Sequence, residues 1–213
     1  MGEIKTNVLY YGDNLDILRN REYFADECVD LIYLDPPFNS KATYNVLFKE
    51  KNGTNSAAQI TAFDDTWHWD INSEKAYREI VETGFSKLVA LIQALRSFLG
   101  TNDMMAYLTM MAIRLVEIHR VLKSTGSIYL HCDPTASHYL KLVLDAIFGA
   151  KNFSNEIIWL RSTDTGSNKS ISKKYPINSD TLLFYTSSDN YNFNPIYNEY
   201  GDEYLKRGNT LAL

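Results

Sequence analysis

The chain has 213 residues, of which 45% are hydrophobic and 13% aromatic, so it can bury a substantial core and is not a disordered protein. Its 21 basic and 26 acidic residues give a net charge of −5, which argues against a uniformly basic nucleic-acid binder but leaves room for a local basic patch. Two cysteines, Cys28 and Cys132, are too few for a disulfide framework and lack zinc-site spacing. With no signal-peptide core and no apolar run of the roughly 18 residues that a membrane span needs, we expect a soluble, cytoplasmic protein without a membrane partner.

The first third of the chain predicts two strands and a long polar excursion. Residues 8–11 are apolar and end in a glycine turn, which predicts a strand followed by a short helix over 15–19. Residues 29–34 form a β-rich run that has to stop at Asp35, because the two prolines after it cannot extend a buried strand. Residues 39–73 are polar and interrupted by Asn and Gly, so they predict a long loop, of a kind that is usually functional or mobile.

The rest of the chain alternates helices and strands. Helices are predicted over 74–99 and 103–122, and Gly126 is expected to terminate the second of them. That second helix has one apolar face with steps of three and four residues, made by Met104, Leu108, Met111, Leu115, Ile118 and Leu122. A further helix is predicted at 136–148, and further strands at 127–131, 157–160 and 181–185.

This order of elements predicts an α/β fold with a mostly parallel sheet that is covered on both faces. In such sheets ligands gather outside the carboxyl ends of the strands. Asp13, Asp35 and Asp133 all fall at those ends, so we expect the functional edge of the molecule there.

The segment from Asp35 to Phe38 carries the groups needed to methylate an amino group on a nucleobase. The lone pair of such an amine is delocalised into the ring, and two acceptors placed on its N–H bonds would localise that pair. The Asp35 carboxylate and the Pro36 carbonyl can be those acceptors, Pro37 fixes the backbone, and Phe38 offers an extruded base a stacking surface. The plainer alternative is that these prolines only make a stiff turn at the end of a strand.

Two other segments are candidates for DNA contact. Trp67 and His68 lie in the polar excursion, where they either touch an opened duplex or anchor the loop to the body. A Ser- and Asn-rich basic loop between two strands suits phosphate contact, or is simply solvated, and contains Arg161, Lys169, Lys173 and Lys174.

The run His131-Cys132-Asp133 ends a strand at the same edge, and either supports the site or packs there. Neither cysteine follows a proline, so nothing supports the covalent route to cytosine C5, which needs an activated thiol.

Several blocks together resemble the amino-methylating DNA methyltransferases of bacteria, the adenine-N6 and cytosine-N4 group that includes the modification subunits of restriction systems. The resemblance covers nearly the whole chain, residues 5–200, and rests on the blocks 12–15, 35–38, 63–67, 107–111, 127–133, 155–159 and 180–185. An Asp before the prolines, where cytosine-N4 relatives usually have Ser, favours adenine.

The resemblance implies a Rossmann-like methyltransferase that uses S-adenosylmethionine to methylate adenine N6 in double-stranded DNA, without a metal. Asp35, Pro36, Pro37 and Phe38 would form its catalytic motif. Asp13, Asn14 and Asp35 would lie at the cofactor. The resemblance also allows a restriction subunit as partner, and an unfinished sheet edge would invite association with a second copy of the chain.

One departure concerns the cofactor. The family binds the methionine end of the cofactor with a G-x-G turn, and no two of the ten glycines here are separated by a single residue. In the permuted branch that turn follows the catalytic motif, near the C-terminus. We therefore expect an incomplete sheet whose C-terminal cofactor half is missing, which would leave this piece without activity on its own.

We expect the chain to consist of two parts. Residues 1–160 are expected to be the catalytic part of the methyltransferase domain, and 161–213 a basic loop, a strand and the start of a target-recognition or C-terminal region. Two alternatives stay open: methylation of cytosine N4, and a module that binds DNA or a partner without catalysis.

Overall fold

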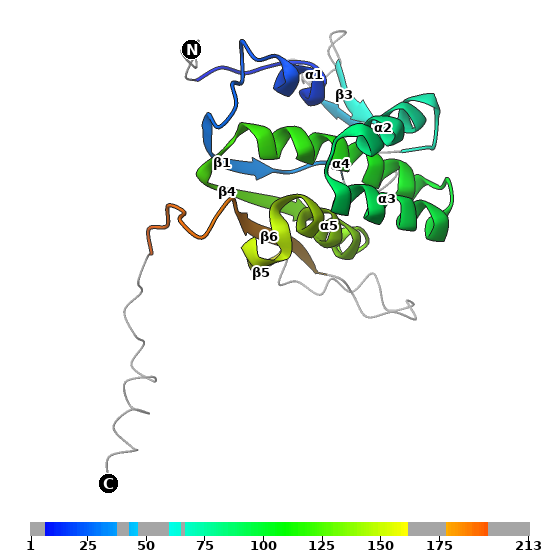
Figure 1. Ribbon diagram of the computed structural model, residues 1–213. Helices are drawn as coiled ribbons and strands as arrows, with labels where there is room; N and C mark the ends of the chain where they lie inside the picture. The colour runs from blue at the N-terminus through cyan, green and yellow to red at the C-terminus, as the bar shows by residue number, and fades with distance from the viewer. Residues whose placement is uncertain (1–6, 38–42, 47–59, 65–66, 162–177, 196–213) are drawn as a thin grey trace.

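The computed structural model describes residues 7–37, 43–46, 60–64, 67–161 and 178–195. Its centre is a sheet with the strand order β1-β4-β6-β5 (Figure 1), made of β1 (Val29–Leu34), β4 (Leu122–Cys132), β6 (Ser179–Thr186) and β5 (Phe153–Leu160). A separate antiparallel ribbon joins β2 (Thr43–Val46) to β3 (Ile60–Asp64). The predicted α/β class is confirmed.

The sheet is mixed, which differs from the mostly parallel pairing that we expected. β1 pairs with β4 in parallel, whereas β6 runs antiparallel to both β4 and β5. Three of the four strands therefore share one direction, and β6 returns between two of them. The reversal could not be predicted, because the hydrophobic pattern of a strand does not encode the direction of its neighbour.

Five α-helices accompany the sheet: α1 (Asn14–Arg19), α2 (Ile71–Glu82), α3 (Ser86–Leu99), α4 (Asp103–Val121) and α5 (Ser137–Leu144). The last continues as a π-helical turn, Asp145–Gly149, and a short 3-10 turn, Ala150–Asn152. The helix predicted over 74–99 is in fact two helices. The chain breaks at Gly84, whose φ of +78° is one that glycine adopts at little cost.

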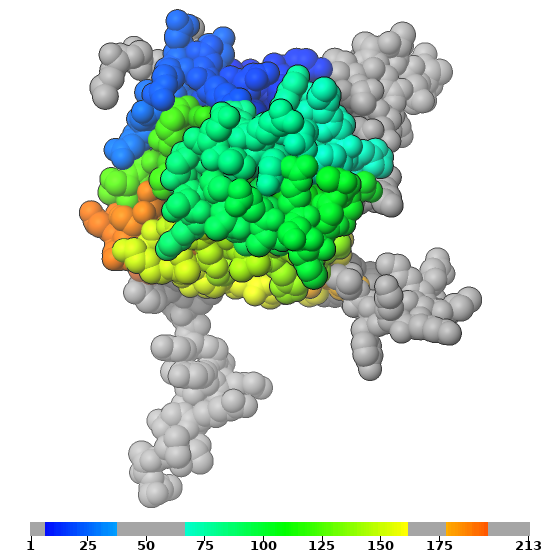
Figure 2. Space-filling model, turned by 45° about the vertical axis from the view of Figure 1, so that its right-hand side comes forward, coloured from blue at the N-terminus to red at the C-terminus, as the bar shows by residue number. Residues whose placement is uncertain are grey.

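Helix α4 is the centre of the hydrophobic core. It is buried along most of its length and contacts α1, α2, α3 and α5. Ile128 and Leu130 of β4 are fully buried in the same cluster, and Ile32 and Leu34 of β1 pack against it. Helices α2 and α3 lie outside α4, and Figure 2 shows residues 71–99 as a continuous turquoise and green surface. The predicted apolar face of α4 is confirmed.

The opposite face of the sheet is more open. Alternate residues of a strand point to opposite faces, and Leu31 and Tyr33 of β1 are 59% and 56% exposed. Farther along this face the rings of Tyr129 and Phe184 stack with centroids 4.4 Å apart. In the described part of the chain the helical core lies against one face, so the expectation that both faces are covered is not met there.

Two other local expectations are wrong. Residues 8–11 do not form a strand, and Leu9 is 94% exposed, because no strand in the described part of the chain pairs with this segment. The region 39–73, expected to be a loop, contains β2, β3 and the start of α2.

Gly126 does not terminate a helix either. Helix α4 ends at Val121, β4 begins at once, and Gly126 lies inside that strand. The residue is needed for a close approach: a Cβ there would lie 2.7 Å from Leu122 Cδ1 and 3.0 Å from the Asp30 carbonyl oxygen. The pairing of β1 with β4 is irregular at this point, between Val29 and Leu31.

We expect Gly126→Ala to lower the free energy of unfolding by about 1–3 kcal/mol, because the added methyl group must displace a backbone carbonyl or a packed side chain. Urea denaturation of the complete protein measures this change. The matched control is Ser124→Ala on the exposed part of β4, expected within about 0.5 kcal/mol of the wild type. Equal stability of the two variants would show that the strands tolerate the extra methyl group.

Candidate functional site

The candidate catalytic motif lies where β1 ends. Asp35 follows the last strand residue, and its side chain is 60% exposed. Pro36 is buried and Pro37 half-buried, so the backbone at the carboxylate is held by packing. The predicted end of the strand is confirmed, and Phe38 lies outside the described residues.

His131 of the neighbouring strand β4 connects the motif to the sheet. Its Nδ1 atom lies 3.3 Å from the Asp35 carboxylate and 3.3 Å from the Tyr33 hydroxyl. Its Nε2 atom lies 3.4 Å from the Asp180 carboxylate on β6. The parallel register pairs Leu34 with Leu130, so one further step brings Asp35 and His131 side by side. One imidazole thus faces two carboxylates at the carboxyl end of β1 and β4.

Tyr33 and Asp180 complete this cluster. Burial, and then the nearby Asp35 carboxylate, raise the pKa of Tyr33, so its hydroxyl stays protonated at neutral pH. Asp180 is only 4% exposed, and Arg161 Nε lies 3.4 Å from its second oxygen. Arg161, predicted to contact DNA, thus forms an ion pair with a buried carboxylate in this structure.

The predicted cofactor residues Asp13 and Asn14 are bound by Arg114 of α4. The Asp13 carboxylate accepts two hydrogen bonds from Arg114, of 2.7 and 2.9 Å, and caps α1 through the Leu15 N–H. Asn14 accepts a third from Arg114 Nε at 2.8 Å. Arg114 is largely buried, so this arrangement fixes the turn before α1 on the core.

Two hollows lie on either side of this turn. An apolar pocket of about 370 Å³ is lined by residues of the turn, by the exposed side of β1 and by α4, among them Gly12, Asn14, Leu31, Tyr33 and Ile118. The structure therefore brings Asn14 to the same pocket as the strand that ends at Asp35. A more polar cleft of about 650 Å³ is lined by Asp13, Trp67, His68, Asp70 and Arg114.

The other predicted DNA-contacting residues divide into two groups. Trp67 is half-buried and packs against the core, whereas His68 is exposed and lies 3.0 Å from Asp103. Both line the polar cleft. Lys169, Lys173 and Lys174 lie outside the described residues.

Cys132 has the properties of a packed thiol. It is fully buried, and burial above all raises its pKa to about 12. The side chain is therefore a neutral thiol at physiological pH and cannot act as the nucleophile of a covalent mechanism.

Three residues of this region were not among the predicted site residues: Tyr33, Arg114 and Asp180. Asp180 lies near the start of β6 and reaches the same edge as the end of β1 only because β6 runs antiparallel to β4, a direction that the sequence does not indicate. Nothing in the spacing of Arg114 indicates its contact with Asp13, which is 101 residues away.

Comparison with known proteins identifies the family. A family model described as DNA methylase, covering the N6 and N4 amino-methylating enzymes, matches residues 29–209. The chain belongs to this DNA methylase family. The match includes Asp35, His131 and Asp180, so the cluster at the end of β1 lies within the region that the family shares.

The relatives of this DNA methylase chain include enzymes of restriction systems. The type III restriction-modification enzyme StyLTI Mod subunit of Salmonella typhimurium is 27% identical over 85% of the chain, and the EcoP15I Mod subunit of Escherichia coli 25% identical over 80%. The type II methyltransferase M.KpnI of Klebsiella pneumoniae is 25% identical over 85% of the chain.

These alignments span 24%, 23% and 32% of those relatives, so the chain covers about a quarter to a third of their length. Among solved structures, the M1.HpyAVI–SAM complex is similar over 90% of this chain and 60% of its own, with a TM-score of 0.43 and 13% identity. No helix in the described part of the methylase chain is long and apolar enough to cross a membrane.

Proposed function

We propose that the complete protein to which this chain belongs transfers a methyl group from S-adenosylmethionine to adenine N6 in double-stranded DNA. The observation that carries the proposal is Asp35: an exposed carboxylate that follows the last residue of β1, next to a buried proline, within the matched family region. Asp before the prolines favours adenine over cytosine.

The described residues fit part of the cofactor. The pocket beside β1 has apolar walls and a volume of about 370 Å³, which suits a purine ring. Asn14 lines this pocket, and Asp35 follows the strand that forms one of its walls. The chain has no G-x-G turn for the amino-acid end. We therefore propose that a further part of the protein completes this site.

In this proposal the chain's own residues prepare the amine for attack. The Asp35 carboxylate and the Pro36 carbonyl accept hydrogen bonds from the two N–H bonds of the amino group, which localises the lone pair on nitrogen. Phe38 stacks on the base after it has left the duplex. S-adenosylmethionine, when bound, would supply a methyl group on a positively charged sulfur. The amine nitrogen would take this methyl group as the carbon–sulfur bond breaks, and the surplus proton of the amine would pass to Asp35 or to water. Asp13 positions the turn that holds Asn14, through its hydrogen bonds with Arg114.

The wider surface supplies DNA contacts in the same proposal. Trp67 and His68 border the polar cleft, and Arg161 begins the basic segment that continues to Lys169, Lys173 and Lys174. Phosphate contacts from such a segment would position the duplex without reading its sequence. Three further predictions belong to the same proposal. The first is that a target-recognition region starts within residues 161–213. The others are a restriction subunit or a second copy of the chain as partner, and a cytoplasmic location.

Methyl transfer by the complete protein tests the proposal. The protein is incubated with double-stranded DNA and S-adenosylmethionine labelled in the methyl group, and the label in the DNA is counted. We expect labelled DNA, and calorimetric binding of the cofactor. A folded protein that binds DNA, but binds no cofactor and transfers no label, would instead support the alternative of a binding module without catalysis.

A further inference from the structure

The pair His131 and Asp180 has no role in the function proposed above, yet it lies next to the group on which that function depends. His131 is largely buried, at 16% side-chain exposure, and Asp180 is 4% exposed. A carboxylate this deeply buried is costly unless cations or hydrogen-bond donors surround it. The groups found there are His131 Nε2 at 3.4 Å and Arg161 Nε at 3.4 Å.

The two carboxylates beside His131 differ in exposure: that of Asp180 is buried and that of Asp35 is exposed. Asp180 lies within the sheet, at the start of β6, whereas the Asp35 side chain is 60% exposed beyond the end of β1. His131 lies between them with one ring nitrogen facing each. The ring thus lies at ion-pair distance from both carboxylates and links the exposed acid to the buried one.

Tyr33 restricts the ring further. Its hydroxyl lies 3.3 Å from His131 Nδ1, and the two rings meet edge to face with centroids 6.4 Å apart. Tyr33 and Asp35 are two residues apart, so they project from the same face of the strand. The exposed carboxylate therefore has a restrained imidazole as its neighbour on the sheet.

We propose that His131 is a positioning residue, which Asp180 holds in place so that it orients the Asp35 carboxylate toward the amino group of the target base. The proposal rests on the proposed methyl transfer. At 60% exposure the Asp35 side chain is not fixed by packing, whereas a catalytic group must be held within about 0.5 Å of its productive geometry. Misplacement of a reacting group by about 1 Å can cost about 100-fold in rate.

The test compares variants of the complete protein under saturating DNA and cofactor. We expect His131→Phe to lower kcat about 10- to 100-fold and to leave the KM values within about twofold, because the residue acts through Asp35 and not on binding. His131→Asn keeps a donor near the position of Nδ1 and should recover part of the loss. Asp180→Asn should lower kcat less than His131→Phe, and the double variant should be no slower than His131→Phe alone.

Cys132→Ala is the matched control, since Cys132 is the next residue of β4, fully buried on the other face. We expect it to lower the melting temperature and to keep the wild-type kcat. A wild-type kcat in His131→Phe would overturn the proposal. So would additive losses in the double variant, or a loss of kcat in Cys132→Ala as large as in His131→Phe.

A crystal structure of His131→Phe separates this proposal from the methyl transfer itself. We expect the Asp35 carboxylate to leave its place beside Tyr33 or to occupy several rotamers. An unmoved, well-ordered carboxylate would contradict the positioning role even if the wild type methylates no DNA. A moved carboxylate in a protein that transfers no methyl group would uphold the positioning contact and refute the proposed function alone.

Discussion

Replacing Asp35 with alanine is expected to lower the methylation rate of the complete protein about 10²- to 10⁴-fold. This range is typical for the loss of a side chain that accepts a proton from the reacting group. The reason is local. Without the carboxylate one N–H bond of the amine has no acceptor, and the lone pair stays delocalised in the ring. Single-turnover methylation with saturating DNA and cofactor measures the effect on this step.

Asp30→Ala is the control for this variant. Asp30 lies on the same strand, is exposed, and pairs with Lys123 at 2.8 Å, away from the end of β1. We expect its rate within about twofold of the wild type, since exposed ion pairs contribute little. If Asp35→Ala retained the wild-type rate while the DNA still gained methyl groups, the amine would be activated elsewhere.

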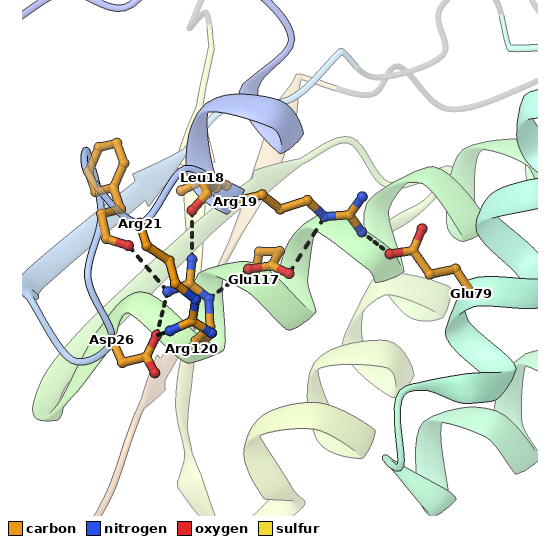
Figure 3. A network of polar contacts seen from close by, with 8 residues as sticks. Leu18, Arg19, Arg21, Asp26, Glu79, Glu117 and Arg120 are labelled. Atoms are coloured by element: carbon orange, nitrogen blue, oxygen red, sulfur yellow. Dashed lines mark hydrogen bonds and ion pairs between the residues drawn. The ribbon is translucent and has the colours of Figure 1, made fainter.

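Arg120→Met is expected to cause the largest loss of stability, about 3 kcal/mol, because it removes a largely buried guanidinium that four acceptors share. Figure 3 shows the guanidinium between α4 and the segment before β1. It donates to the carbonyl oxygens of Leu18 and Phe24 at 2.6 and 3.2 Å, and to the carboxylates of Asp26 and Glu117 at 2.6 and 2.7 Å. The variant leaves all four acceptors without this donor, and urea denaturation measures the change.

Arg21→Met is the matched control, because Arg21 binds the same Asp26 at 2.7 Å but is 66% exposed. Its loss should cost about 0–1 kcal/mol. The same network includes Arg19, which pairs with Glu79 of α2 and lies 3.6 Å from Glu117. Equal costs for Arg120→Met and Arg21→Met would mean that α1 and the segment after it are held by apolar packing instead.

The elements that the sequence predicts best are those with a strong local pattern. The apolar run 29–34 is followed by two prolines, and β1 ends where they require. The three- and four-residue steps of 103–122 predict α4 to within one residue at its C-terminal end. The role of Asp35 and Pro36 as a pair of acceptors is likewise inferred from residue type, and it stays a prediction.

The errors arise where a distant partner decides the structure. Residues 8–11 have the composition of a strand, but a strand needs a neighbour, and the described residues contain none for it. Gly126 resembles a helix terminator, whereas its actual role is to make room for a backbone carbonyl of β1. The antiparallel direction of β6 likewise depends on its pairing with β4 and β5.

The supporting residues of the candidate site are hidden from the sequence for the same reason. His131 and Asp35 are 96 positions apart, and Asp180 follows 49 positions after His131, yet the order of strands in the sheet brings them together. Arg114 similarly reaches Asp13 across 101 positions. Residue type indicates which groups are reactive, and only the fold shows which groups hold them.

The most direct test of the account identifies the methylated nucleoside. Unmodified double-stranded DNA is treated with the complete protein and S-adenosylmethionine, digested to nucleosides and examined by mass spectrometry, with Asp35→Ala in parallel. We predict N6-methyladenine from the wild type and none above background from the variant. N4-methylcytosine as the product, or N6-methyladenine formed equally well by Asp35→Ala, would contradict the assignment of Asp35 as the group that prepares an adenine amine for methylation.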